Sequence, residues 1–354
     1  MGKIVSSEQL GRQPITFGRQ TGELNIYDGL STPVSDDIIE LSDRHAQQIT
    51  DFAMISARQF GDQDGNKELT RVQAEIGVPS LVVRIDASII DGEIAPYEME
   101  DSPSGQGITD RLHSAVAGAG IRGLILDHYD RQFGNIPRVI ISGERSHGTD
   151  DVIIVGDDRY LFDQSFEAKA NPSDPVIVKT IPGRPSSQDP YLQLQAQAVA
   201  PLITEGDKSY LERIGSLKPA QSEADLLTDD DGNLVSQVLK SRLGSMAMGV
   251  SIYLTNEDKK QFTGAGTVTA SKLRSRRKEY QDFRSGALVQ PFLPPIAFEN
   301  PEKRSRAILR IFALLDPEGA RVIGGCYVAR PGMVVHGASD AISGAVLYNG
   351  GSSI

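Results

Sequence analysis

Apolar and polar residues follow one another along this chain in patterns that predict a mixed α/β protein. A β-branched run at 81–90 predicts a strand, Asp91-Gly92 predicts a tight turn, and 93–100 predicts the strand that returns beside it. Apolar residues at helical spacing between residues 36 and 71 predict an amphipathic helix instead. We therefore expect a helical N-terminal region followed by a β-hairpin.

The rest of the chain predicts shorter elements. A helix at 112–119 and short strands at 123–126, 138–141 and 151–155 indicate a small α/β unit. Five prolines between residues 171 and 190 indicate an extended connection at a domain boundary, and 191–203 predicts a helix. Strand-like runs separated by turn signals then predict largely antiparallel sheet; they lie at 234–240, 249–254, 287–291, 307–314, 322–328 and 333–336.

Charge and composition narrow the range of functions. The 354 residues include 36 Lys and Arg against 47 Asp and Glu, a formal net charge of −11. That excess of negative charge argues against a protein that binds nucleic acids or anionic membranes in general, because contacts with phosphates need a positive surface. No apolar run approaches the roughly 18 residues that span a bilayer. With Cys326 as the single cysteine, neither a disulfide framework nor a cysteine-based zinc cluster is expected, and a cytoplasmic location is the default.

The predicted hairpin carries the most informative charges. Arg84 and Asp86 are two residues apart on one strand, Glu98 and Glu100 are two apart on the other, and period-two geometry places each pair on one face. Carboxylates collected in this way suit Mg²⁺ that carries phosphates, and the Arg84 guanidinium suits a phosphoryl oxygen. The alternative is an exposed charged hairpin face, which composition alone favours. The small-residue loop at 101–107 favours the metal site.

A second candidate site lies around Lys240. A predicted strand delivers Lys240 and then opens into a loop of small residues that includes Gly244 and Ser245, so backbone N–H groups can approach phosphates while the lysine supplies charge. A hairpin with a flexible glycine loop explains the same pattern equally well. The formal Gly-x-Gly-x-x-Gly match at 118–123 is discounted, because it follows a predicted helix and precedes a predicted strand, the reverse of a dinucleotide site.

Two strands in the last third add candidate ligand contacts. The strand at 287–291 contains Gln290 and ends in proline, which leaves backbone groups that an adenine ring can hydrogen-bond. Arg330 ends another strand within reach of a phosphate, although an ordinary arginine at a hairpin end is the simpler interpretation. Cys326 lies in that same apolar strand and is expected to be a buried, inert thiol rather than a nucleophile.

Taken in order, these segments resemble the glutathionylspermidine synthase family, the circularly permuted branch of the ATP-grasp ligases. That family has Arg-x-Asp, then Glu-x-Asn before a loop of Pro, Thr and Ser. Further along it has Lys-Ala-x-x-Pro on a helix, a strand-borne lysine before a glycine-rich loop, a glutamine-bearing strand, and an arginine that follows a glycine near the end. The corresponding segments here are Arg84-Ile85-Asp86, Glu98-Met99-Glu100, Gln197-Ala198-Val199-Ala200-Pro201, Lys240-Ser241, Val289-Gln290-Pro291 and Gly325-Cys326-Tyr327-Val328-Ala329-Arg330.

The resemblance implies an ATP-grasp fold in circularly permuted order, with largely antiparallel sheets that clamp a nucleotide and a small inserted α/β domain. It implies N-terminal helices and the metal-carboxylate half at 1–115, the small α/β domain at 116–175, and the nucleotide-binding half at 176–354. The implied activity is that of an ADP-forming carboxylate–amine ligase that works through an acyl phosphate. Its substrates would be a small-molecule or peptide carboxylate and an amine such as a polyamine.

The same resemblance implies a role for each candidate residue. The Mg²⁺ ligands would be Asp86, Glu98 and Glu100. The catalytic arginines would be Arg84 and Arg330. The ATP contacts would be made by Lys240, Gly244, Ser245 and Gln290.

Two positions depart from the family pattern. Glu100 stands where family members have asparagine, which adds a negative charge, and Gln197 stands where they have a lysine that contacts ATP. Lys179, Lys208 or Lys218 are candidates to substitute for that lysine. These departures leave a second interpretation open, in which the protein is a non-catalytic member of the family that acts as a nucleotide-binding or protein-interaction module.

Overall fold

The computed structural model of the protein describes most of both ends of the chain and shorter stretches between them. The residues it describes are 2–10, 15–18, 20–27, 30–61, 82–100, 103–134, 138–142, 160–161, 176–180, 218–219, 235–241, 250–255, 258, 287–299, 304–331 and 341–350. The predictions for 151–155, 191–203 and 333–336 lie outside these residues, as do Gly244, Ser245, Gln197 and Lys208.

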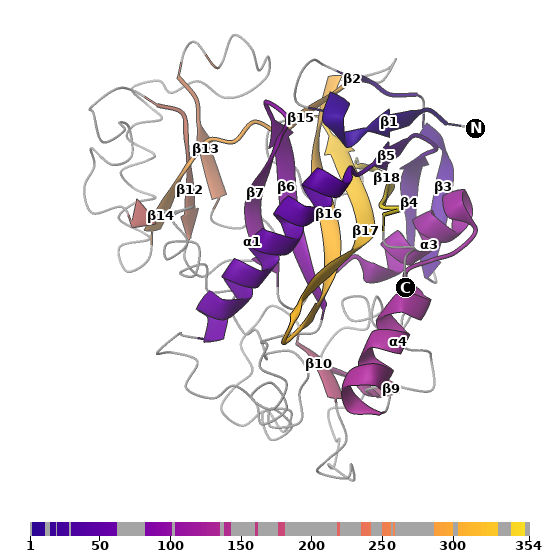
Figure 1. The fold of residues 1–354 in the computed structure, drawn as a ribbon. Coiled ribbons are helices and arrows are strands. Elements are labelled where there is room, and N and C mark those ends of the chain that lie inside the picture. The colour runs from indigo at the N-terminus through magenta and orange to yellow at the C-terminus, as the bar shows by residue number, and fades with distance from the viewer. Residues whose placement is uncertain are drawn as a thin grey trace.

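One large mixed sheet of eleven strands dominates the described part of the chain (Figure 1). Five of its strands come from the N-terminal segment: β1 (Ile4–Ser6), β2 (Ile15–Thr16), β3 (Gln20–Tyr27), β4 (Leu30–Ser35) and β5 (Ile38–Glu40). The other six are β6 (Val82–Ile90), β7 (Glu93–Glu100), β15 (Ile296–Glu299), β16 (Arg304–Asp316), β17 (Gly319–Arg330) and β18 (Ile342–Leu347). The sequence pattern had predicted β6, β7, β16 and β17, and these strands are confirmed.

Long-range pairing unites the two ends of the chain in this sheet. Strand β16 lies between β17 and the β6–β7 hairpin, and all of these neighbours are antiparallel. Strand β17 pairs with β18, which in turn pairs in parallel with β5, and β5 pairs with β1. The hairpin that carries the charged residues is therefore anchored on the central strand of the C-terminal segment.

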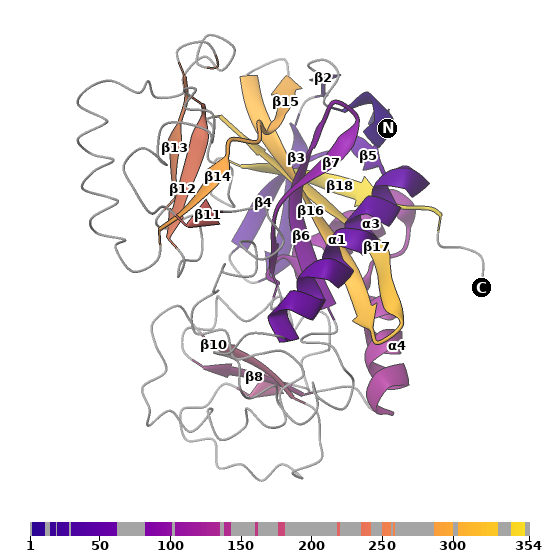
Figure 2. The same cartoon turned by 60° about the vertical axis from the view of Figure 1, so that its left-hand side comes forward.

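Within the described residues, three helices cover the sheet: α1 (Asp43–Gly61), α3 (Gln106–Ala117) and α4 (Arg122–Phe133). Apolar residues of α1 and α4 belong to the main core, together with Ile85, Leu309 and Tyr327 of the sheet. Leu112 of α3 instead packs with Cys326 and other residues that alternate with Tyr327 along the sheet. Because neighbouring residues of a strand face opposite sides, α3 covers the face opposite to α1 (Figure 2).

One predicted helix and one predicted strand need correction. The helix predicted between residues 36 and 71 begins only at Asp43, because Ile38–Glu40 forms β5 and the Ser42 hydroxyl accepts a hydrogen bond from the His45 backbone N–H (3.3 Å), as an N-cap does. The strand predicted at 123–126 is wrong, since these residues lie in α4. A short apolar run fits strand or helix equally, and here the burial of every fourth residue, Ile121, Ile125 and Tyr129, selects the helix.

Two smaller sheets complete the described structure. The first, in the order β10-β8-β9, is parallel and consists of β8 (Arg138–Ser142), β9 (Tyr160–Leu161) and β10 (Val176–Thr180). The second, in the order β11-β14-β12-β13, is antiparallel and consists of β11 (Lys218–Pro219), β12 (Gln237–Ser241), β13 (Val250–Tyr253) and β14 (Ala287–Pro291). The strands predicted at 138–141, 234–240, 249–254 and 287–291 are thus confirmed.

The described structure is therefore a mixed α/β fold with few helices, as the sequence predicted at that coarse level. The proline-containing stretch after residue 171 includes strand β10 rather than extended connection alone. Among the described helices, none has both the length and the apolar character that crossing a membrane requires.

Candidate functional site

The β6–β7 hairpin turns at the position that the sequence predicted. Asp91 and Gly92 adopt φ angles of 53° and 84°, the left-handed conformation that a two-residue hairpin turn requires. An Asp-Gly pair tolerates this conformation better than other residues because glycine has no Cβ. Pairing starts from this turn with Ile90 opposite Glu93.

A β-bulge within the hairpin decides which face the acidic residues occupy. Ala87 pairs with Pro96 and Asp86 pairs with Glu98, so Tyr97 is an extra residue with no partner in the β6–β7 register. Pro96 has no N–H to donate, which suits a strand position beside a bulge.

Without this bulge the carboxylates would not converge. Continued from the turn without interruption, the register would place Tyr97 opposite Asp86 and Glu98 opposite Ile85, on the other face of the sheet. The extra residue shifts the pairing by one position. Glu98 and Glu100 therefore lie opposite Asp86 and Arg84 on a shared face.

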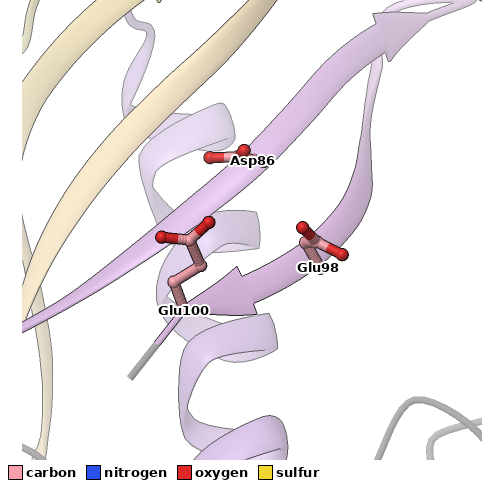
Figure 3. Close-up of side chains that lie close together, drawn as sticks. All are labelled: Asp86, Glu98 and Glu100. Carbon is pink, nitrogen blue, oxygen red and sulfur yellow. The ribbon is translucent and has the colours of Figure 1, made fainter. Parts of the chain in front are cut away.

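Three carboxylates meet on this face, those of Asp86, Glu98 and Glu100 (Figure 3). One oxygen from each residue lies within 4.8 Å of the others. Asp86 is buried, whereas the side chains of Glu98 and Glu100 keep 20% and 36% of their surface exposed. Oxygen atoms in such a group are the ligands that hard divalent cations prefer. The predicted convergence of these residues is confirmed, and this group is called the acidic triad below.

Arg84 binds two members of the acidic triad. Its Nε donates to Asp86 Oδ1 (2.7 Å), and one terminal nitrogen donates both to Asp86 Oδ2 (3.1 Å) and to Glu100 Oε1 (2.5 Å). The other terminal nitrogen donates to the Ser104 carbonyl (2.7 Å), in the small-residue loop that precedes α3. The guanidinium is thus held between the triad and the start of a helix.

Burial and neighbouring charges shift the pKa values of Arg84 and Glu100. Burial acts against the charged guanidinium, but attraction to Asp86 and Glu100 outweighs it, and the pKa of Arg84 lies above its usual value. Burial raises the pKa of Glu100 although attraction to Arg84 acts in the opposite direction. Because a third of the Glu100 side chain is exposed, solvent moderates this shift.

Lys240 reaches the acidic triad from the other antiparallel sheet. It lies on β12 and is buried, with Nζ 3.5 Å from Glu98 Oε2 and 3.5 Å from the Tyr97 carbonyl oxygen. Lys240 therefore meets the hairpin at its bulge. The sequence had placed Lys240 in a separate candidate site, and the structure joins the two.

The linker between β14 and β15 is also attached to the hairpin. The Ser88 hydroxyl donates to the Pro294 carbonyl (2.9 Å), and the Tyr97 hydroxyl donates to the Leu293 carbonyl (3.4 Å). Burial raises the pKa of Tyr97, so its hydroxyl stays protonated and able to donate at neutral pH. These contacts fix the approach of the sheet that carries Lys240.

The remaining predicted residues occupy nearby strands. Gln290 is buried on β14, opposite Val238 and on the same face of that sheet as Lys240. Arg330 ends β17 on the same sheet face as Cys326, four residues further along. Cys326 is buried, as predicted, and that burial raises the pKa of its thiol.

Sequence reasoning missed Arg310. It lies on β16 directly between Asp86 of β6 and Cys326 of β17, and its Nε is 3.9 Å from Asp86 Oδ2. A sequence signal was present, because a single arginine interrupts an otherwise apolar run at 307–314. Such a residue in a buried strand needs a partner or a function.

The acidic triad is surrounded by protein cations. Arg84, Lys240 and Arg310 each lie within 4.0 Å of one of its carboxylate oxygens. Charge balance therefore does not by itself require a metal ion, and an ion-pair network remains an alternative explanation of the cluster. Comparison of the sequence with protein-family models and with curated proteins finds no match to this chain.

Proposed function

We propose that this protein is an ATP-dependent carboxylate–amine ligase of the ATP-grasp type, with the permuted element order described above. The observation that carries the proposal is the contact between two sheets: the acidic triad on the β6–β7 hairpin and Lys240 on β12 meet at one point. A nucleotide bound between such sheets would have its phosphates beside both a set of metal ligands and a fixed cation. This arrangement is what phosphoryl transfer to a carboxylate requires.

The donor set fits Mg²⁺. The three ligand atoms are carboxylate oxygens close enough to share one ion, and the partly exposed side chains of Glu98 and Glu100 leave a path from solvent. When bound, Mg²⁺ would neutralise charge on the phosphates. Asp86, buried and pinned by Arg84, is the rigid member of the set.

The protein's own cations would then change partners. Lys240 would exchange its contact with Glu98 for a phosphate oxygen, and Arg84 would share its donors between Asp86 and the transferred phosphoryl group. Gln290 lies on the same sheet face as Lys240, where it can contact the rest of the nucleotide. In the full reaction ATP phosphorylates a carboxylate, an amine attacks the acyl phosphate, and the products are an amide, ADP and phosphate.

A second candidate function is nucleotide binding without catalysis. The observation that favours it is the contact between Arg84 and Glu100. Glu100 stands where the family that this sequence resembles has a neutral asparagine. Here Glu100 accepts a hydrogen bond from Arg84, the same arginine that would bind the phosphoryl group in the ligase. If that ion pair persists with nucleotide bound, Arg84 cannot serve the transfer step.

Phosphate release distinguishes these functions. The full chain is incubated with ATP, Mg²⁺ and panels of carboxylates and amines, beside the variants Asp86→Ala and Lys240→Ala. Asp51→Ala and Lys3→Ala are the matched controls, since Asp51 lies on the exposed side of α1 and Lys3 precedes β1. The ligase predicts release that needs both an acid and an amine, is lost in the first two variants and is retained in the controls.

Calorimetric titration with ATP and Mg²⁺ completes the test. In one outcome the wild type binds ATP and yet releases no more phosphate than the two variants with any acid and amine of the panel. That result would reject the ligase and favour the nucleotide-binding module. Absence of ATP binding would reject both functions.

A further inference from the structure

Arg310 lies at the centre of a row of polar residues that crosses the large sheet. Glu98, Asp86, Arg310 and Cys326 stand directly opposite one another on β7, β6, β16 and β17. Residues that are opposite in an antiparallel pair share a face, so the Arg310 side chain emerges on the face of the acidic triad. The same face is the one that α3 covers beside Cys326.

The hydrogen bonds around Asp86 leave the Nε of Arg310 without an acceptor among the described residues. Both Asp86 oxygens already accept from Arg84, at 2.7 and 3.1 Å, whereas Arg310 Nε remains 3.9 Å away. That distance exceeds a hydrogen bond, and the buried Nε has no hydrogen-bond partner among the described residues. A buried donor left unsatisfied costs stability, so Arg310 is poorly explained as a purely structural ion pair.

Two further arginines share this face of the sheet. Arg306 and Arg330 stand directly opposite each other on β16 and β17, on the same side as Arg310 and separated from it by one further pair of residues. The concentration of arginine is notable in a chain with a net charge of −11. Guanidinium groups present forked donors that match the oxygen atoms of carboxylates and phosphates.

We propose that Arg310 binds an oxyanion of a ligand, a phosphate or a carboxylate group, beside the acidic triad. The unsatisfied Nε–H would donate to this group, and the Arg306 and Arg330 side of the sheet would extend the site. The proposal goes beyond the ligase function, because it applies to any ligand that carries such an oxyanion. It names a binding residue that the sequence motifs do not include.

Binding of simple anions to the full chain tests this inference without nucleotide or metal. Inorganic phosphate and acetate are titrated separately, and binding is followed by calorimetry. The variants are Arg310→Met, which removes the charge, and Arg310→Lys, which keeps the charge and loses the fork. Arg321→Met is the matched control, because Arg321 lies on the neighbouring strand β17, near the β16–β17 turn, beside Asp316 and Arg131 rather than the triad.

We expect at least one of the two anions to bind the wild type, with affinity at least tenfold weaker in Arg310→Met, weakened in Arg310→Lys and unchanged in Arg321→Met. Preference for phosphate identifies a phosphoryl subsite, and preference for acetate identifies a carboxylate subsite. Arg310→Lys keeps the test valid if Arg310→Met does not fold. Absence of binding by both anions, or equal binding by wild type and a folded Arg310 variant, overturns the inference, while the ligase is judged separately by phosphate release.

Discussion

Replacement of Lys240 by methionine should tighten the binding of Mg²⁺ to the nucleotide-free protein. The lysine ammonium already occupies one of the proposed metal ligands, since its Nζ lies 3.5 Å from Glu98 Oε2. An incoming cation must therefore displace Lys240 or accept its repulsion. Methionine has a similar length and no charge, so it removes this competition while it fills the same buried space.

The size of the effect follows from Coulomb's law. Opposite unit charges 3.5 Å apart attract by about 1 kcal/mol in water and by about 5 kcal/mol at an effective dielectric constant of about 20. The Lys240 and Glu98 side chains are 7% and 20% exposed, so the true value lies between these limits. If removal of the lysine charge releases only the lower value of about 1 kcal/mol, the dissociation constant for Mg²⁺ in Lys240→Met falls about fivefold relative to the wild type.

Calorimetric titration of Mg²⁺ into wild type and Lys240→Met measures this difference. Lys3→Met is the charge-matched control, because β1 is separated from β6 in the sheet by β5, β18, β17 and β16. The same Lys240→Met protein should bind ATP more weakly, since the phosphates lose a cation. Weaker or unchanged Mg²⁺ binding in Lys240→Met, with the fold intact, would refute the idea that the lysine and the metal compete for the acidic triad.

Four further variants probe the bulge, the buried His128 and two glycines. Deletion of Tyr97, the extra residue of the bulge, should leave Glu98 opposite Asp86 and Glu100 opposite Arg84 in a regular ladder, so Mg²⁺ binding in calorimetry should be retained; a folded deletion variant that has lost Mg²⁺ binding would contradict this. Burial lowers the pKa of His128, so the unfolded state binds protons more readily and the free energy of unfolding should fall as the pH drops below about 6.5. His128→Gln should make that fall shallower in urea titrations, and an unchanged slope would count against it. Gly324→Ala should lower the melting temperature sharply, since φ is 100° and a Cβ would lie 2.4 Å from a histidine of α3, whereas Gly123→Ala on open α4 surface should raise stability by about 0.5–1 kcal/mol; similar shifts in both would refute this contrast.

The hairpin was predictable because its signals are local. Alternating β-branched residues and the Asp91-Gly92 turn define two strands within twenty residues, and the structure has them at those positions. The register was not predictable from the same signals. It depends on the bulge at Tyr97, for which Pro96 is the sole local hint, and a shift of one residue moves every side chain to the other face.

Elements stabilised by distant partners escaped the sequence pattern. The short strand β5 exists because it pairs with β18, from the opposite end of the chain, and β1 in turn pairs with β5. A three-residue strand carries too little periodicity to be recognised alone. Arg310 was missed for a related reason: only the pairing of β16 with β6 brings it beside Asp86.

A crystal structure of the protein with Mn²⁺ in place of Mg²⁺ and a non-hydrolysable ATP analogue tests the central proposal most directly. The anomalous signal of Mn²⁺ locates the metal without ambiguity. The account predicts Mn²⁺ coordinated by Asp86, Glu98 and Glu100 and by phosphate oxygens, with Lys240 moved from Glu98 to a phosphate. A nucleotide bound elsewhere, or an acidic triad that stays paired with Arg84 and Lys240 without metal, would contradict it.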